Sequence, residues 1–128
     1  MTEMTSVTRV MYVEDIDLVR EITCELLARD DREVQAFSTA EDALAEFERN
    51  PYDVVITDVS LPSMSGLSLA RRIVEISPST ALIIASGYPL DFGAGEIGAN
   101  VRAILKPFEA AQIDSVIESL LESMLGRD

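Results

Sequence analysis

The sequence contains no histidine and only one cysteine, Cys24. Without histidine there is no Ser-His-Asp or Cys-His pair for nucleophilic catalysis, and the most common metal ligand and general base is missing. A single cysteine can form neither an internal disulfide nor a cysteine-based zinc cluster. Cys24 lies among Ile22, Leu26 and Leu27, which favours a packing role over a reactive thiol. Any chemistry must therefore use carboxylates, hydroxyls, lysine or a metal ion.

Basic residues are few. The chain has 10 Lys and Arg against 23 Asp and Glu, which gives a formal net charge of −13. A field of this sign repels nucleic acid and anionic lipid and favours cations and basic partner surfaces, so we expect no direct DNA binding and no membrane association. No apolar run approaches the ~20 residues of a membrane span, and no signal-peptide hydrophobic region precedes the first predicted strand. A cytoplasmic location is the resulting expectation.

Linkers and low-complexity tracts are also absent. A chain of 128 residues that is 48% apolar and 26% charged has the composition of a globular domain. We expect residues 1–128 to form one domain without a second module. Short β-type runs alternate with amphipathic segments. Strands are predicted at residues 8–13, 33–37, 53–58, 80–85 and 101–105, and helices at residues 16–29, 39–50, 65–76, 88–99 and 109–125.

Five strands separated by helices predict an α/β fold with one parallel sheet, right-handed crossovers and helices on both faces. The more polar strand at residues 33–37 is expected at an edge of that sheet. The first helix carries its apolar residues on one side, namely Ile16, Val19, Ile22, Leu26 and Leu27. The helix at residues 88–99 is weakened by ~1 kcal/mol relative to alanine at each of three glycines, which are Gly93, Gly95 and Gly98.

Polar residues follow four of the predicted strands at the points where they end. Glu14 and Asp15 follow the first strand, Asp58 ends the third, Ser86 follows the fourth and Lys106 follows the fifth. Parallel strands end along one edge, where open α/β proteins place their chemistry, so these side chains should meet in one crevice. Taken singly, each has an ordinary structural explanation as a helix cap, turn or loop residue. Their joint occurrence at successive strand ends favours a functional site.

Three clustered carboxylates require either raised pKa values or a cation, since two unit charges ~4 Å apart repel by ~4 kcal/mol at an effective dielectric of ~20. Oxygen ligands with room for water and phosphate suit Mg²⁺. We assign Asp15 and Asp58 as direct ligands, Glu14 as a ligand through water, and the Ser60 carbonyl as a further donor. A carboxylate can also accept a phosphoryl group. Asp58 is the candidate acceptor, with phosphoryl oxygens contacted by two further side chains, Lys106 and Ser86.

These residues resemble the receiver domain of two-component response regulators over almost the whole chain. The likeness rests on Glu14-Asp15, Asp58 with Pro62 and Gly66, Ser86, and Lys106-Pro107-Phe108. It implies a flavodoxin-like (βα)5 fold with strand order 2-1-3-4-5 and a cis peptide before Pro107. It also implies that Asp58 takes a phosphoryl group, with Mg²⁺, from a phosphohistidine of a sensor kinase or phosphotransfer protein. Such a domain is not an enzyme beyond its own phosphorylation and dephosphorylation.

One position departs from the family pattern. The strand-five aromatic that moves with the strand-four hydroxyl would fall at Ala103, so the usual rotamer switch cannot operate. The run from Ala85 to Tyr88 is similar to a receiver subgroup without that aromatic. We hypothesise that signalling instead orders or shifts residues 88–99; the alternative is that Ala103 and Tyr88 merely pack. In relatives, the positions of Ser60 and Tyr88 border the path of the hydrolytic water. We therefore expect Tyr88 to shield the acyl phosphate and lengthen its lifetime.

Other interpretations remain open at this point. An aspartate-dependent phosphatase would have a second Asp two residues after the nucleophile, where this chain has Ser60. A flavin-binding domain would need an anion-friendly loop after the first strand, whereas this loop is acidic. A receiver-like scaffold without phosphorylation and a receiver piece of a hybrid kinase or larger regulator are further alternatives; a start at Met1 and a stop soon after the last predicted helix favour a stand-alone protein. The resemblance places the partner surface on the fourth helix, fifth strand and fifth helix, as a monomer or an activation-dependent dimer.

Overall fold

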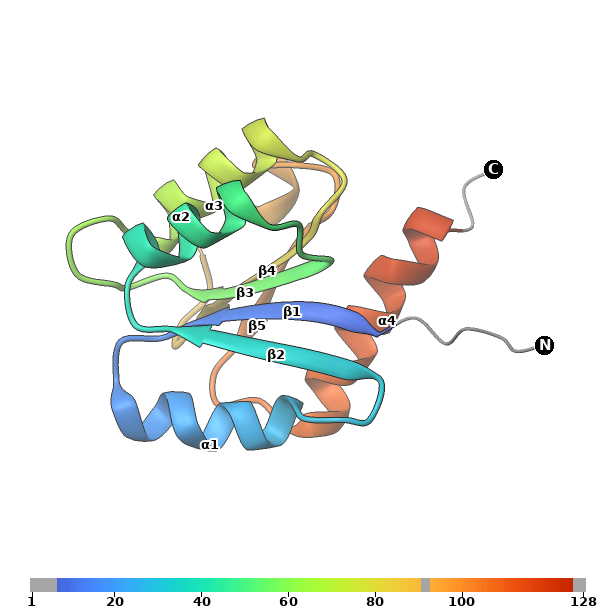
Figure 1. Ribbon diagram of the computed structural model, residues 1–128, viewed down its shortest axis with the longest axis horizontal. Coiled ribbons are helices and arrows are strands. Elements are labelled where there is room, and N and C mark those ends of the chain that lie inside the picture. The colour runs from blue at the N-terminus through green and yellow to red at the C-terminus, as the bar shows by residue number, and fades with distance from the viewer. Residues whose placement is uncertain (1–6, 91–92, 126–128) are drawn as a thin grey trace.

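The computed structural model describes residues 7–90 and 93–125. Its centre is a five-stranded parallel sheet in the order β2-β1-β3-β4-β5, with helices on both faces (Figure 1). This confirms the predicted fold class and strand order, and it places the polar strand β2 at an edge. The elements run β1 (Thr8–Val13), α1 (Asp17–Leu27), β2 (Arg32–Phe37), α2 (Ala40–Arg49), β3 (Val54–Asp58), α3 (Gly66–Ile76), β4 (Ala81–Ser86), a 3-10 turn η1 (Ala94–Glu96), β5 (Val101–Leu105) and α4 (Ala110–Leu125).

The central strands are buried on both faces because two core layers lie against them. Alternate residues of β1, β3 and β4 point to opposite sides. One layer packs beneath α2 and α3 and includes Met11, Val55, Leu69, Ile73 and Leu82. The other packs beneath α1 and α4 and includes Tyr12, Leu27, Ile56, Ile83, Ile113 and Ile117. Burial of each large apolar side chain contributes ~1.5–3 kcal/mol to folding, so these layers are the main stabilisation of the sheet and of its carboxyl edge.

Two helices begin at a side-chain cap. The Thr39 hydroxyl accepts a hydrogen bond from the Asp42 N–H at the start of α2, and the Ser65 hydroxyl accepts one from the Ser68 N–H at the start of α3. Ile16 precedes α1 and has no side-chain cap. The loop from β1 to α1 must therefore be held by other contacts, which bear on the site described below.

The apolar side of α1 is only partly buried. Thr23 and Leu27 are buried, whereas Ile16, Leu18 and Ile22 are 54%, 65% and 55% exposed. The helix covers one face of the sheet near its β2 edge and also contacts α4 (Figure 1), so part of its predicted apolar side is left at the surface. Cys24 packs, half-buried, against the core beneath α1, and burial raises the pKa of its thiol against the opposing charge of Arg20. These contacts agree with a packing role for Cys24.

The helix predicted at residues 88–99 is wrong for the described part of that segment. Only the short 3-10 turn η1 forms there, and residues 91–92 lie outside the described residues. Glycine makes a helix costly at two positions around this turn, Gly93 and Gly95, and Pro89 lacks a backbone donor. The described part of this segment therefore places no long helix over β5, and Arg102, Ala103 and Leu105 are exposed.

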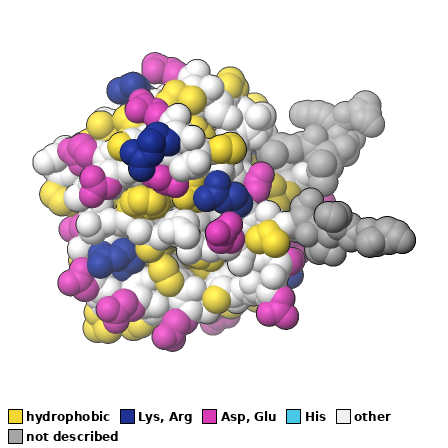
Figure 2. Space-filling view, viewed as in Figure 1, with side chains coloured by type: hydrophobic (Ala, Val, Ile, Leu, Met, Phe, Trp, Pro, Cys, Tyr) yellow, Lys and Arg dark blue, Asp and Glu magenta, His cyan; other side chains and the backbone are white. Residues whose placement is uncertain are grey.

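No helix among the described residues combines the length and apolar character needed to cross a membrane. Acidic side chains are spread over the face seen in Figure 2, with Lys and Arg side chains among them. One group of acidic side chains, Glu14, Asp15 and Asp58, lies together at the carboxyl edge of the sheet.

Candidate functional site

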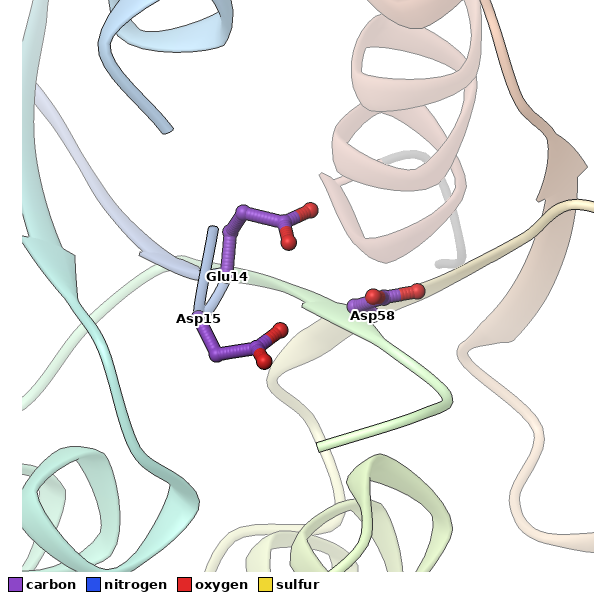
Figure 3. A group of neighbouring side chains, drawn as sticks. All are labelled: Glu14, Asp15 and Asp58. Carbon is purple, nitrogen blue, oxygen red and sulfur yellow. The ribbon is translucent and has the colours of Figure 1, made fainter. Parts of the chain in front are cut away.

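Three carboxylates meet at the carboxyl edge of the sheet, as the strand ends predict. Glu14 and Asp15 follow β1 and Asp58 is the last residue of β3 (Figure 3). One oxygen atom from each lies within 4.8 Å of those from the other two. Glu14 is fully buried, Asp58 is 9% exposed and Asp15 faces solvent. Glu14 and Asp58 are thus the buried side of the cluster and Asp15 is its exposed side, from which a ligand in solution can reach the carboxylates.

Lys106 links two of these carboxylates. Its Nζ lies 3.1 Å from Glu14 Oε1 and 3.4 Å from Asp58 Oδ1. The residue follows β5, and its backbone N–H donates to the Ser86 carbonyl oxygen at 2.8 Å, which extends the pairing of β4 with β5. The Lys106–Pro107 peptide bond is cis, as the resemblance implies. Lys106 therefore occupies the position predicted for a cation that faces Asp58.

The surroundings shift the pKa values of both partners. Burial raises the pKa of Asp58, and the nearby Glu14 charge adds to this, so that together they outweigh the opposing charge of Lys106. For Lys106, burial lowers the pKa, but the hydrogen bond to Glu14 and the charge of Asp58 outweigh burial and leave it raised. Lys106 thus stays protonated, and it lies beside Asp58, a carboxyl group whose ionisation is disfavoured. A positive charge arriving at Asp58 would relieve that cost.

Further donors fix the Glu14 carboxylate. Its Oε2 accepts the Ile16 backbone N–H at 3.2 Å, and its Oε1 accepts the Tyr12 hydroxyl at 3.4 Å in addition to Lys106. Burial is the main cause of a raised pKa for Tyr12, so this hydroxyl keeps its proton and acts as a donor. Glu14 is therefore held from several sides and cannot turn freely toward solvent, in keeping with a contact to a cation through water.

The Ser86 side chain lies at the same edge, but its hydroxyl is engaged locally. It donates to the Tyr88 carbonyl oxygen at 2.6 Å and accepts the Tyr88 N–H at 3.2 Å. Ser86 is buried, whereas Tyr88 is 61% exposed. The predicted contact of Ser86 with a phosphoryl oxygen would require the hydroxyl to leave the Tyr88 carbonyl. The donation to a phosphoryl group stays a prediction.

The remaining predicted positions are exposed. Ser60 lies on the loop after β3 with an exposed side chain, and the metal contact of its carbonyl oxygen stays a prediction. Ala103 is exposed on β5 and, with Tyr88, lines a groove of about 430 Å³ between β5 and residues 88–90 and 93–95. Both residues border this groove. Their roles in switching stay predictions.

Gly66 explains why the loop after β3 can fold back on Asp58. A Cβ atom at this position would collide with the Asp58 carbonyl oxygen and would lie 3.0 Å from Thr57 Oγ1. The Gly66 N–H donates to the Val59 carbonyl oxygen at 2.9 Å. The glycine predicted from the motif thus lets α3 begin directly against the backbone of Asp58.

Sequence reasoning missed Arg20. Its guanidinium donates to the backbone carbonyl oxygen of Glu14 at 2.9 Å and to Asp17 Oδ1 at 2.7 Å. The only signal available was a basic residue near the start of a helix that follows two acids, and such a residue is common without any function. Its contact with the loop that carries Glu14 and Asp15 could not be read from spacing.

Comparison with known proteins decides the family. The family model for the response regulator receiver domain matches residues 10–118. The chain belongs to this family. Among solved structures, the response regulator receiver domain protein from Clostridium thermocellum is 28% identical to this receiver domain, with a TM-score of 0.82 over 91% of this chain and 95% of that one. The CheY-like receiver domain protein from Methanospirillum hungatei shows the same fold, with 24% identity and a TM-score of 0.86 over 96% and 100% of the two chains.

Curated relatives include both short and long proteins. The transcriptional regulatory protein CseB of Streptomyces avermitilis is 34% identical over 92% of this receiver domain, which spans about half (51%) of that relative's length. The response regulator receiver protein CpdR of Brucella abortus is 25% identical over 88% of this chain and 96% of its own length. The sensor kinase CckA of Brucella abortus matches at 29% identity, but this chain covers 13% of it. Receiver domains of this kind thus occur alone and within larger proteins.

Proposed function

We propose that Asp58 accepts a phosphoryl group from a phosphohistidine on a sensor kinase or phosphotransfer protein, and that this modification switches an interaction with a downstream protein. The observation that carries the proposal is the position of Lys106 Nζ, which spans Glu14 and the mostly buried Asp58 at the carboxyl edge of the sheet. Membership of the receiver family supports it. The donor imidazole must lie outside residues 1–128, since this sequence has no histidine.

The proposed transfer makes one bond and breaks another. An Asp58 carboxylate oxygen forms a P–O bond while the P–N bond of the donor breaks, and the imidazole nitrogen leaves with the electron pair and then takes up a proton. Such transfers depend mainly on positioning and charge neutralisation. Lys106 would balance charge on a phosphoryl oxygen, and Ser86 would donate to another after releasing the Tyr88 carbonyl. The product is an acyl phosphate on Asp58.

The donor set fits Mg²⁺. Three carboxylates against one ammonium leave two negative charges, and carboxylate oxygens with an open solvent side suit this ion. We propose that Asp15 and Asp58 bind it directly, Glu14 through water, and the Ser60 carbonyl as a further donor. When bound, Mg²⁺ neutralises charge on the phosphoryl oxygens. Asp15 and Glu14 would serve to hold it, while Lys106 stays in contact with both Glu14 and Asp58.

We propose that the phosphoryl donor docks over α1. A donor side chain can reach Asp58 only if its protein covers this edge of the sheet. The adjoining surface carries the exposed apolar residues Ile16, Leu18 and Ile22. Beside them lies a groove of about 380 Å³ whose walls include Leu26 and Phe108. Apolar contact there would place a donor at the open side of the acidic cluster while burying surface that is otherwise costly to expose.

The proposal treats the chain as a single receiver domain whose output passes through a protein surface. The net charge of −13 disfavours contact with DNA by this domain itself. Some relatives are transcriptional regulators or methylesterases of greater length, so the activity of any larger protein is a separate matter. For this domain we propose no turnover of small molecules beyond its own phosphorylation and dephosphorylation. Exposed Ser60, in place of a second acid, argues against the aspartate-dependent phosphatase.

Incubation with acetyl phosphate and Mg²⁺, followed by intact-mass measurement, tests the acceptor. The wild-type chain should gain the mass of one phosphoryl group, which hydroxylamine should remove because it cleaves acyl phosphates. Asp58→Asn should gain nothing, whereas Asp30→Asn, a change in an exposed turn, should behave as wild type. Phosphorylation that persists in Asp58→Asn, or that never appears in the wild type, would refute the proposal.

A further inference from the structure

Asp15 depends on its backbone for its position. Among the described residues, no hydrogen bond or ion pair reaches its side chain, which faces solvent, although its carboxylate belongs to the acidic cluster. The neighbouring Ile16 is 54% exposed and provides no side-chain cap for α1. One point of the loop is held by the Glu14 carboxylate, which accepts the Ile16 backbone N–H at 3.2 Å. The contacts that hold the loop backbone therefore determine the position of the Asp15 carboxylate.

Arg20 supplies a second hold on this loop. One amino group of its guanidinium, Nη1, donates to the Glu14 carbonyl oxygen at 2.9 Å, and the other, Nη2, contacts Asp17 Oδ1 at 2.7 Å. The two acceptors flank Asp15 and Ile16 in the sequence. A planar guanidinium that binds on both sides of a two-residue segment restricts that segment more than a single point contact would. The peptide that joins Glu14 to Asp15 is thereby fixed directly.

The location of Arg20 argues against an incidental surface ion pair. A cation near the N-terminal end of a helix is disfavoured by the helix dipole, so the residue needs a compensating contact there. The Arg20 side chain is 22% exposed, whereas Arg49, which makes an ion pair of the same spacing with Glu46, is 69% exposed. Arg20 differs from Arg49 in its second contact, to the backbone of the acidic loop.

We propose that Arg20 is a positioning residue that holds Asp15 in the geometry needed to bind a divalent cation beside Asp58. This inference rests on the proposed function of the acidic cluster. Arg20 acts through the backbone of Glu14 and touches neither the cation nor the phosphoryl group. Its removal should therefore loosen the metal site while leaving Asp58 and Lys106 in place.

Mg²⁺ titration of the intact chain by calorimetry separates this role from a general charge effect. Arg20→Gln and Arg49→Gln each remove one positive charge, which by itself would strengthen cation binding. We expect Arg20→Gln to weaken Mg²⁺ binding by about 5- to 10-fold, a loss of roughly 1 kcal/mol. Arg49→Gln should bind Mg²⁺ as tightly as wild type or slightly more tightly. Arg20→Lys keeps the charge but cannot span both acceptors, and it should lie between wild type and Arg20→Gln.

Amide exchange gives a readout that does not depend on the metal. Without Mg²⁺, Arg20→Gln should speed exchange at residues 15–18 and leave β3 unchanged. Mg²⁺ affinity in Arg20→Gln equal to or above that of wild type would overturn the inference. If Arg20→Gln does not fold, affinity in Arg20→Lys equal to that of wild type has the same consequence. Absence of Mg²⁺ binding in the wild type itself would instead overturn the metal assignment in the proposed function.

Discussion

At the scale of single residues, Asp58 carries its charge where burial and Glu14 disfavour it. Its pKa is raised in the folded chain, so the folded state holds the Asp58 proton more tightly than the unfolded state does. Stability therefore falls as pH rises from the ordinary aspartate pKa of ~3.9 through the raised folded pKa, and the loss is complete above it. At neutral pH without divalent metal, Asp58→Asn should remove this loss and raise stability by on the order of 1 kcal/mol, or about 4 °C in Tm.

Thermal unfolding across a pH series checks this expectation. The gain from Asp58→Asn should shrink as the pH falls below the raised pKa, since the wild-type carboxyl group is then neutral as well. Asp30→Asn, in an exposed turn, should show little gain at any pH. A stability gain for Asp58→Asn that stays constant down to acidic pH would contradict an origin in the Asp58 charge.

Gly66 limits how close α3 can come to the acceptor strand. Alanine favours a helix over glycine by ~1 kcal/mol, so Gly66→Ala at the first residue of α3 should be harmless on propensity alone. The added Cβ would instead collide with the Asp58 carbonyl oxygen, a backbone atom that cannot rotate away. We expect Gly66→Ala to lower the free energy of unfolding by about 3 kcal/mol or more, as overpacking does. Urea unfolding measures this loss.

Gly95→Ala is the matched control for Gly66→Ala. A Cβ at Gly95 meets nothing within 4 Å, and neither glycine has a positive φ. The change should leave stability unaltered or raise it by about 0.4–1 kcal/mol through the unfolded state. Equal effects of Gly66→Ala and Gly95→Ala would show that the contact with the Asp58 carbonyl has no energetic consequence.

Site residues could be predicted from the sequence where topology alone decides their position. Glu14, Asp15, Asp58 and Lys106 come together because parallel strands end at one edge, whatever their rotamers. The partner of the Ser86 hydroxyl and the reach of the Arg20 guanidinium depend on rotamers selected by neighbouring segments. Spacing in the sequence carries no information about such choices.

At the scale of elements, strands were predicted better than helix faces. The strands β1, β3 and β4 are apolar runs buried on both sides, and their order follows from the family resemblance. The described part of residues 88–99 differs because glycine and proline oppose the helix that the alternation of strands and helices predicts there, and only the 3-10 turn η1 forms. The exposed apolar side of α1 shows the converse: periodicity predicts a helix but does not say how much of its apolar side the sheet covers.

Segment 88–99 is the element that we expect to respond to modification of Asp58. Ser86 Oγ binds both the carbonyl and the N–H of Tyr88, so a phosphoryl group that draws the hydroxyl away would free the start of this segment. Amide exchange with beryllofluoride and Mg²⁺, a phosphoryl mimic, should therefore change at residues 86–99 in the wild type. Ser86→Ala should show fast exchange at Tyr88 without the mimic and little further change with it. Unchanged protection across residues 86–99 in the wild type would contradict this switching route.

At the scale of the whole molecule, the charge of −13 sets the response to ions. Self-repulsion opposes the compact state, so NaCl should raise Tm by screening. Mg²⁺ should add a second, saturable gain because it binds the folded acidic cluster, about 2.7 kcal/mol at 100 times its Kd. Thermal unfolding in MgCl₂ and in NaCl of matched ionic strength separates the two effects.

Asp15→Asn and Asp30→Asn each remove one negative charge and so relieve general repulsion alike. Only Asp15 lies in the acidic cluster; Asp30 lies in an exposed turn. The gain of MgCl₂ over matched NaCl should therefore nearly vanish in Asp15→Asn and persist in Asp30→Asn. If both variants keep the full gain, Mg²⁺ stabilises the chain through its diffuse field, and the carboxyl edge of the sheet is not where it binds.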